Sequence, residues 1–555
     1  KIDNENREKV IYVGSNSGAL HAINATTGQE LWAFIPPFIA AQFPTMVNSN
    51  LNSIDGGGSN AIYGVDGSPT VHDMYFSHPI RGLDWYTILM IPYGRGGAGF
   101  SVLDITNPTA PLHLYSVFND EINHFVHHVD HLGVFNKWPY ISAVYSLANF
   151  GEAKLAIQKE QQGITDTTCT DVKDDQGQLT TTCYKSNVWT FPIDITIDDI
   201  KNIKVNGTEI AGYSVSQNAS GDTIITFADE MTYQANADAP ETTTALSLTL
   251  DKSSDKLGVT DELKGKFYDY STLAETWSSP RIFRMPNTDA PDDEPADDIY
   301  VAVMGAGIST ANEYIGSSVF VINLEDTTHI GKVEKKIDID NLEGDGIVSS
   351  TPATPTVVTA DTGTTGIRFR GALVYQPDYE GKITKINLTN MKCDNGFLSG
   401  DCPEGREEIK RFDKTILFSA GTNNINQRLM YHALDATIGT TTSGLWLFNS
   451  TGDFSRINDR STGVENIMFG IRDKDFPNFR FIDGDPIEDI EDISDCVDTT
   501  DDETGELCPD STKKGWYIKL KDFAKGSAEP TVFAGRVYFP IYKPNENDLC
   551  AIGNA

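Results

Sequence analysis

The sequence predicts an all-β protein: a β-propeller of about six to seven blades with an inserted, mostly β domain that carries a short helix. Three observations lead to this fold class. Short apolar segments of strand length recur throughout and are separated by glycine-containing turns. They share one repeated plan. The 555 residues also exceed the roughly 250–300 residues that one hydrophobic core serves, which favours a modular or radial architecture.

The first segment, Ile11–Phe34, shows the plan most clearly. Two extended runs, KVIYV and ALHAIN, flank Ser15–Gly18, a sequence typical of a tight hairpin turn. A second turn follows at Gly28, where a residue without a Cβ is favoured, and Leu31–Phe34 resumes an extended run. The segment therefore predicts a meander of short strands, which needs neighbouring sheets to cover its apolar faces.

The same plan returns along the chain as a strand, a glycine-containing turn and a second strand that ends in Asp or Asn. We count about six such units, and successive units are tens of residues apart, as expected of propeller blades. After the first, they begin near residues 86, 299, 371, 428 and 515.

The middle of the chain departs from this plan. A segment with helical periodicity is followed by an acidic cysteine-containing loop and by alternating strands with VNG and SGD turns. We therefore predict first blades at 1–116, an inserted domain at 117–272 and the remaining blades at 273–555. Insertions of this kind are tolerated in the loops at one face of a propeller.

The formal net charge is −36, and the acidic residues are spread over the whole chain. Such a surface repels phosphate backbones and anionic lipids, so we expect no nucleic-acid partner. It favours cations instead. No apolar run reaches the roughly 18 residues of a membrane span, and we predict none in these 555 residues.

Six of the seven cysteines form three close-spaced pairs, each around a polar loop. None has the CxxC spacing of zinc or redox sites, so we predict three local disulfides and an oxidising compartment. The seventh, Cys550, has no partner in this set. The pairs are Cys169 with Cys183, Cys393 with Cys402, and Cys496 with Cys508.

Several segments, in this order, resemble the C-terminal propeller domain of PilC/PilY-type type IV pilus biogenesis and tip adhesin proteins. The resemblance covers about three quarters of the chain but not the insert. The matching segments are IYVGSNSGALHAINATTGQELWAFIP (11–36), YGVDGSPTVHD (63–73), the stretch 85–108, TWSSPRI (276–282), GWYIKL (515–520), GRVYFPIYKP and DLCAIGNA.

The resemblance implies a non-enzymatic protein that is exported through the periplasm to the cell surface or pilus tip. It implies action in pilus assembly and adhesion by binding. The partners would be type IV pilins or minor pilins, together with a host, surface or cell-envelope ligand.

The family also implies a calcium-binding loop just before a motif that matches Tyr375–Leu388. The corresponding loop here keeps only Asp361 of the expected acids, before Gly363 and Gly366. Calcium prefers six to eight oxygen ligands, so this departure puts calcium binding in doubt. An ordinary turn is the alternative.

The segment DEINHFVHHVDHLG, residues 120–133, has apolar residues at helical spacing and predicts the short helix. Its other face would carry His124, His128 and His131, with His127 one position away and Asp130 able to add an oxygen. Imidazoles four residues apart on a helix can share a transition metal. The alternative is a solvated polar face whose histidines titrate near pH 6.5.

One enzyme class remains as an alternative function, because NATTGQELW (24–32) is similar to the repeats of quinone-dependent dehydrogenase propellers. Only one clean copy is present, and no two cysteines are adjacent as in those enzymes. GxSxG, HExxH, GxxxxGK[ST] and CxxCH motifs are also absent from the sequence. We interpret Trp32, Trp85, Trp277, Trp446 and Trp516 as core residues.

Overall fold

The structure is a computed structural model of the 555-residue chain. The chain forms two compact units: unit 1 comprises residues 1–137 and 270–555, and unit 2 comprises 138–269. The structure describes residues 7–44, 62–123, 125–139, 144–146, 172–173, 179–191, 197, 200–205, 208–217, 223–236, 246–250, 267–287, 294–309, 315–339, 349–359, 369–394, 396–398, 401–422, 426–438, 444–460, 463–494 and 513–545.

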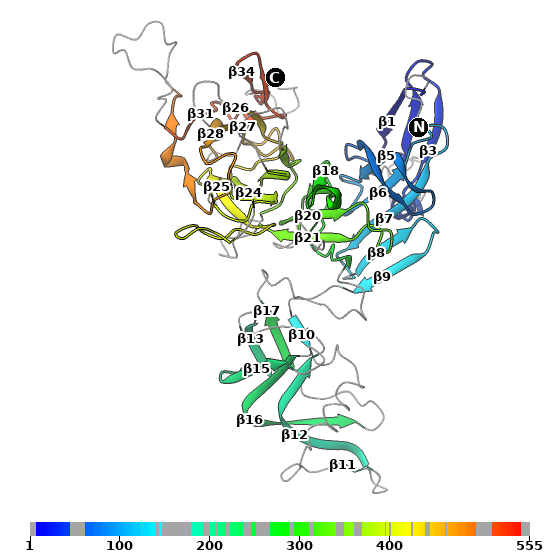
Figure 1. The fold of residues 1–555 in the computed structure, drawn as a ribbon, viewed down its shortest axis with the longest axis vertical. Helices are drawn as coiled ribbons and strands as arrows, with labels where there is room; N and C mark the ends of the chain where they lie inside the picture. Colours follow the sequence, from blue (N-terminus) through cyan, green and yellow to red (C-terminus); the bar gives the residue numbers. More distant parts are fainter. Residues whose placement is uncertain are drawn as a thin grey trace. The chain divides into compact units, whose positions relative to one another are not determined.

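Unit 1 is built from largely antiparallel meander sheets that follow one another along the chain (Figure 1). The first sheets contain β1 (Val10–Gly14), β2 (Leu20–Asn24) and β3 (Glu30–Phe34), then β4 (Thr70–His78), β5 (Gly82–Pro92), β6 (Gly99–Asp104), β7 (Leu112–Asp120), β8 (Phe125–Asp130) and β9 (Phe135–Pro139). The next contains β18 (Arg281–Met285), β19 (Ile299–Gly305), β20 (Ser318–Asn323) and β21 (Val333–Asp338).

The remaining sheets of unit 1 keep the same order and gain extra edge strands. One contains β22 (Thr356–Thr359), β23 (Gly371–Pro377), β24 (Lys382–Thr389), β25 (Lys414–Ser419) and β29 (Asp483–Pro486). Another contains β26 (Asp435–Ile438), β27 (Leu445–Ser450), β28 (Ile467–Asp473), β31 (Gly515–Lys519) and β30 (Glu491–Asp492). Two small sheets pair β32 (Lys525–Gly526) with β35 (Ile541–Tyr542), and β33 (Thr531–Phe533) with β34 (Arg536–Tyr538).

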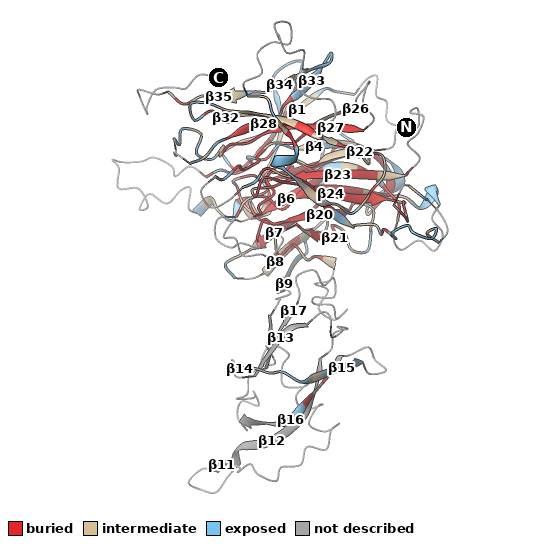
Figure 2. Ribbon diagram, turned by 90° about the vertical axis from the view of Figure 1, so that its left-hand side faces the viewer, coloured by how far each residue is buried: buried red, intermediate tan, exposed pale blue. Residues whose placement is uncertain are grey.

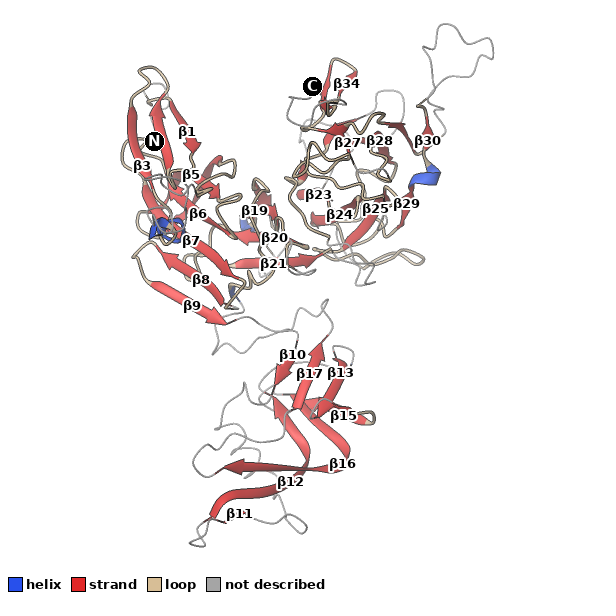
Figure 3. Ribbon diagram, turned by 180° about the vertical axis from the view of Figure 1, so that it is seen from behind, coloured by secondary structure: helices blue, strands red, loops and turns tan. Residues whose placement is uncertain are grey.

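Helix is confined to short pieces in the described residues (Figure 3): α1 (Pro37–Ala40), η5 (Pro295–Asp297) and η6 (Ile487–Asp489). None of the helices in these ranges has the length and apolar character that a bilayer crossing requires. The predicted all-β class with blade-like sheets is therefore confirmed.

In several sheets of unit 1, a strand carries an Asn or Asp at or near its end that closes the following turn. Asn24 Oδ1 accepts the backbone N–H groups of Thr26 and Thr27, and Asn323 Oδ1 accepts those of Glu325 and Asp326. Asp104 and Asn387 make the equivalent bonds to Thr106 and Thr389. Short polar side chains stabilise turns in this way, which explains the recurring Asp or Asn in the repeated unit.

The first strands share a second pattern, which the sequence analysis did not identify. Three of them directly follow a Pro and begin with Thr or Arg and a β-branched residue: the segments are Pro69–Val71, Pro280–Ile282 and Pro355–Val357. Neighbouring first strands are joined, because Thr70 Oγ1 donates to the Pro280 carbonyl at 3.0 Å and Thr356 Oγ1 to the Leu434 carbonyl at 2.7 Å.

The sheets pack face to face through their middle strands. All residues of β6, β20 and β24 are buried, because a neighbouring sheet covers each of their faces (Figure 2). One core cluster joins the sheets of β23 and β28 through side chains such as Tyr375, Phe418 and Phe469. Burial of several tens of such side chains supplies the main driving force for this architecture.

Residues 125–130 form strand β8, so the helix predicted at 120–133 is wrong. β8 pairs antiparallel with β7 from Tyr115↔Asp130 to Asp120↔Phe125 and extends the sheet of β4 to six strands. The first predicted boundary of the insert, at residue 117, falls inside β7, whereas unit 2 begins at Trp138. Residues 125–130 form a strand because they hydrogen-bond to the edge of β7, and the local periodicity of the sequence contains no information about that edge.

Unit 2 consists of two antiparallel four-stranded sheets. One contains β10 (Val144–Ser146), β17 (Leu246–Leu250), β13 (Ile200–Val205) and β14 (Thr208–Glu209). The other contains β11 (Val172–Lys173), β12 (Leu179–Phe191), β16 (Thr223–Asn236) and β15 (Tyr213–Gln217). Near the first and last residues of the unit, the rings of Trp138 and Tyr268 stack with centroids 4.2 Å apart, so the segments that enter and leave the unit are in contact.

Candidate binding face

The histidines predicted as metal ligands lie on and after β8, except His124, which is outside the described residues. His127 and His128 are consecutive strand residues and therefore point to opposite faces of the sheet. His127 Nε2 lies 3.4 Å from Asp120 Oδ2. The helical spacing on which the metal prediction rested is therefore not present.

His128 is buried and has a structural partner. Its Nε2 donates to the Ile330 carbonyl at 2.8 Å, and its ring stacks on Tyr115. Burial lowers the pKa of His128 to about 4, against the opposing effects of the Ile330 bond and Asp130. Asp130 Oδ1 accepts the N–H groups of Leu132 and Val134, which closes the turn containing His131.

No group of three or more His, Cys, Asp or Glu side chains is arranged to hold a metal ion within the described ranges. Asp361 lies outside the described residues, so calcium binding at its loop stays a prediction. Of the predicted cysteine pairs, Cys393 and Cys402 form a disulfide. Cys183 lies in β12, whereas Cys169, Cys496 and Cys508 lie outside the described residues, so the other two pairs stay predictions.

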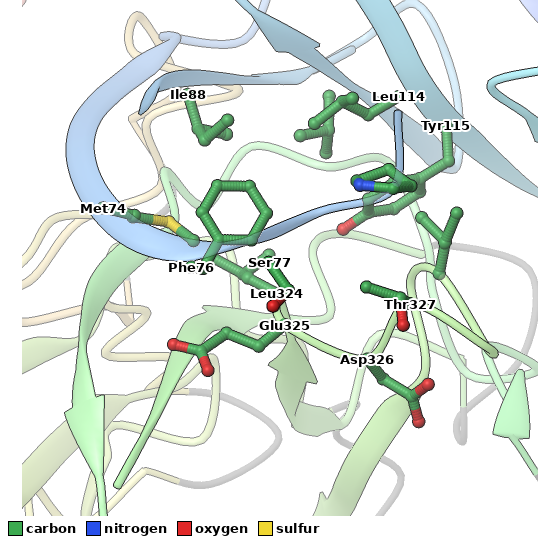
Figure 4. Close-up of a pocket in the computed structure, with 13 residues that line it drawn as sticks. Met74, Phe76, Ser77, Ile88, Leu114, Tyr115, Leu324, Glu325, Asp326 and Thr327 are labelled. Atoms are coloured by element: carbon green, nitrogen blue, oxygen red, sulfur yellow. The ribbon is translucent and has the colours of Figure 1, made fainter. Parts of the chain in front are cut away.

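A cavity lies between the sheet of β4 and the turn after β20 (Figure 4). Apolar side chains such as Met74, Phe76 and Leu114 line it, and Glu325 and Asp326 stand on its other side. It encloses about 20 Å³, which is room for one water molecule. This space is too small for an organic cofactor or substrate.

A larger group of polar and aromatic residues lies on one side of unit 1. There, the segments that connect one sheet to the next, which we call links, meet the turns between the second and third strands of the sheets. We call this side of unit 1 the linker face; its described links are residues 62–69, 270–280, 349–355 and 426–434, and its turns include 93–98 and 378–381. Backbone hydrogen bonds join them in succession, from Asp66 N to Tyr93 O, Gly94 N to Thr276 O, Tyr379 N to Ser350 O and Met430 N to Asp378 O.

Two threonine hydroxyls fix the geometry of this face. Thr276 Oγ1 accepts the Tyr93 N–H at 2.8 Å and donates to the Gly99 carbonyl at 2.6 Å, so it closes the turn between β5 and β6. Thr351 does the same for the turn after β19, with the Ala306 N–H at 2.8 Å and the Ser318 carbonyl at 2.9 Å. Each hydroxyl thus ties a link to the preceding sheet.

Glycine allows the close approach at the turn between β5 and β6. A Cβ at Gly96 would collide with the Gly64 carbonyl oxygen, and Gly94 has φ +58° beside the Gly67 amide. Residues with a Cβ adopt the conformation of Gly94 at a cost, and a Cβ at either glycine would also push the turn away from the link 62–69. The glycine-rich sequence therefore brings Tyr63 and Arg95 within contact distance.

Arg95, at the tip of this turn, is held between two aromatic rings. Its guanidinium carbon lies 5.2 Å from the Tyr63 ring centroid and 4.9 Å from the Trp277 ring centroid. Each contact is in the range of a cation–π interaction, worth about 0.5–1 kcal/mol at exposed sites. The three residues come from two different links and a turn, and Tyr63 is half exposed.

Two carboxylates, Glu275 and Asp66, lie near this cation. Trp277 Nε1 donates to Glu275 Oε2 at 3.2 Å. Partial burial raises the pKa of Glu275, and nearby Asp66 adds to the rise while Trp277 and Arg95 oppose it. Burial and the charge of Glu275 likewise raise the pKa of Glu121. The linker face therefore combines one aromatic-stacked cation with an excess of negative charge.

A tyrosine pair extends the linker face. The rings of Tyr379 and Tyr431 lie 4.8 Å apart, and the Tyr431 hydroxyl donates to Asp453 Oδ1 at 3.0 Å. Burial raises the pKa of Tyr431 to about 12. Burial also raises the pKa of Tyr379, and the charges of Asp453 and Glu275 add to that rise. Both phenols stay protonated near neutral pH, and the Tyr431 hydroxyl acts as a hydrogen-bond donor.

The linker face has the features of a surface that binds another protein. Rigid aromatic side chains with adjacent hydrogen-bonding groups are typical of protein-binding surfaces, and the carboxylates favour a basic partner. Sequence analysis missed the site because it assigned Trp277 to the core. The one available signal was the glycine cluster at 94–99, which permits close approach of other chain segments.

No family model matches the chain. Over 112 residues it is 38% identical to the type IV pilus biogenesis factor PilY1 of Pseudomonas aeruginosa strain UCBPP-PA14, and over 104 residues 39% identical to the PilY1 homolog of Xylella fastidiosa strain Temecula1. These matches cover 20% and 19% of this chain, and 8% of each relative's length.

Among solved structures, the chain matches the crystal structure of the Pseudomonas aeruginosa PilY1 C-terminal domain with a TM-score of 0.48 and 14% identity, over 98% of this chain and 77% of that one. The matched relatives are named as type IV pilus biogenesis factors, the family that the sequence segments resemble. The chain resembles the PilY1-type type IV pilus biogenesis factors.

Proposed function

We propose that this protein acts in type IV pilus assembly and adhesion, at the cell surface or pilus tip, by binding and without catalysis. The observation that carries the proposal is the 38% identity with a pilus biogenesis factor over 112 residues. Its partners are type IV pilins or minor pilins, and a host, surface or cell-envelope ligand. A basic segment of such a partner would find carboxylates and aromatic rings on the linker face.

The architecture supports a binding role. Hydrogen bonds from Thr276 and Thr351 hold the links rigidly, so little conformational entropy is lost when a partner binds. Hot-spot residues at interfaces are enriched in Trp, Tyr and Arg, the three types that stack at Arg95.

The test combines location and binding. Immunogold labelling of the producing cells should mark pilus tips or the cell surface, and immobilised protein should retain purified pilins or minor pilins. Glu275→Lys should weaken that retention at least about tenfold, because it replaces a carboxylate of the linker face by a cation that repels a basic partner. Glu404→Lys, the same charge change beside the disulfide, is the matched control. A cytoplasmic label, or equal retention by both variants, would refute the proposal.

A further inference from the structure

β1 occupies the place of a second strand in its sheet. The next strand, β2, ends at Asn24, whose side-chain bonds match those of Asn323 at the end of third strand β20 and resemble the bond of Asn387 near the end of third strand β24. In the other meander sheets the second strand has a first strand beside it, as β19 has β18 and β23 has β22. Within the described residues, β1 pairs with β2 alone.

The backbone groups on the open edge of β1 can be identified. Lys9 and Ser15 bond to β2, through Ala25 N to Lys9 O and Ser15 N to Ala19 O. Alternate residues of an antiparallel strand direct N–H and C=O to the same side. Val10 and Tyr12 therefore point theirs to the other edge, away from β2.

A groove of about 500 Å³ borders this end of β1. Tyr12–Asn16 line one wall and Val65–Pro69 the other. Tyr12, Val13 and Gly14 belong to β1, whereas Ser15 and Asn16 belong to the turn after it, so the groove lies along the last three residues of the strand. The first strands β18, β22 and β26 contain 5, 4 and 4 residues, which is the length of segment that we expect at this edge.

An apolar surface lies exposed on the adjoining sheet. Leu89 and Ile91 of β5 are covered by the sheet of β1. Val71, Tyr75 and Trp85 lie on the same face, since Val71 pairs with Leu89 and Tyr75 with Trp85, yet each is nearly half exposed. A strand added to the open edge of β1 would extend that sheet over Val71 and Tyr75.

We infer that the open edge of β1 binds an extended segment of a partner protein, which adds to the sheet as an antiparallel first strand. The chain's own first strands show the side chains that fit: β-branched residues in alternation, as in Thr70–Val71 and Thr356–Val357. Asp66 in the groove wall and Asp73 beside Val71 are exposed, so basic residues flanking the segment complement the site.

The register determines which N–H groups of the segment bind. Tyr12 faces the sheet of β5 and directs its N–H and C=O outward. A residue opposite Tyr12 exchanges both hydrogen bonds with it and shares its face. The residues of the segment that cover Val71 and Tyr75 are therefore those whose N–H groups bond to β1.

The probe is a fluorescein-labelled peptide, Lys-Val-Thr-Val-Thr-Val-Lys, added to the purified protein. We expect the valines to face Val71 and Tyr75. N-methylation of the three valines should weaken binding at least about tenfold, because it removes the N–H groups that bond to β1. N-methylation of the two threonines removes only outward N–H groups and should leave the affinity within about threefold.

A protein variant supplies the reciprocal test. Val10→Pro removes one outward N–H at the first position of an edge strand, where proline is tolerated, and should weaken peptide binding about tenfold. Val10→Thr keeps both the N–H and the β-branched shape and is the matched control. In hydrogen exchange, the peptide should slow the amides of Val10 and Tyr12.

Several results would overturn the inference. Equal effects of the two methylated peptides would show that side chains alone bind. Amides of Val10 and Tyr12 that are already protected in the dilute protein would show that its own chain covers the edge, and protection that rises with protein concentration would show a second copy there. If the peptide binds as expected but purified pilins do not, this docking mode stands and the proposed function falls.

Discussion

Lys385 on β24 and Asp473 at the end of β28 form an ion pair at 2.6 Å, and both side chains are 2% exposed. The Tyr375 hydroxyl donates to the same Asp473 oxygen at 2.7 Å, and Lys385 Nζ also donates to the Asn478 carbonyl at 2.7 Å. The pair therefore joins two neighbouring sheets inside their shared core. Its charges are stabilised by hydrogen bonds in place of water.

Lys385→Met should destabilise the protein by about 3–5 kcal/mol, because it leaves the Asp473 carboxylate buried without its cation. Urea unfolding followed by tryptophan fluorescence measures the change. Lys543→Met is the control, since its pair with Asp522 is exposed and worth about 0–1 kcal/mol. The double variant Lys385→Met/Asp473→Leu should recover part of the loss; a loss as large as the sum of the single variants would contradict this account.

Thr276→Val should cost about 1–3 kcal/mol while keeping the shape of the side chain, because the Tyr93 N–H and Gly99 carbonyl lose a buried partner. Thr351→Val should behave alike, since its hydroxyl has the same role. The measurement is the midpoint of denaturant unfolding, compared between variants whose unfolding free energy depends equally on denaturant concentration. Thr109→Val at an exposed turn should change little, and equal effects at Thr109 and Thr276 would speak against the role of the hydroxyl.

Stability should fall as the pH decreases from about 6.5 to about 4, because His128 resists protonation in the folded state. Burial holds its pKa near 4, below the unfolded value of 6.5, so its contribution is complete above about pH 6.5 and lost progressively below. His128→Gln keeps a donor for the Ile330 carbonyl but does not titrate. Urea unfolding at pH 7 and pH 5 should show a smaller decrease in the variant; identical decreases would exclude His128 as the cause.

Removing the Cys393–Cys402 disulfide should destabilise the protein by about 2–3 kcal/mol, the loop entropy expected for a bond that spans 9 residues. The double variant Cys393→Ala/Cys402→Ala tests this without affecting other cysteines. Thermal unfolding should show a lower midpoint than for Asp401→Ala in the same loop. An unchanged midpoint would mean that the loop is already ordered without the bond.

The strands predicted from local pattern are largely present, because glycine turns and the closing Asn or Asp act over only a few residues. Segment 125–130 shows the limit of that reading. Phe125, Val126 and Val129 fit a helical stripe, but Val126 and His128 also alternate as buried strand residues. The open edge of β7 decided between the two, and it is formed by residues that local periodicity does not include.

The sequence by itself determined the all-β class, the repeated strand–turn–strand unit and the resemblance to pilus biogenesis factors, because these depend on short-range turn chemistry and alternation. Only the tertiary structure decided that Trp277 is partly buried beside a cation and that Trp85, also assigned to the core, is nearly half exposed. Trp277 meets Arg95 and Tyr63 across links far apart in the chain. Such contacts arise from the packing of neighbouring sheets, a long-range property that a linear pattern does not specify.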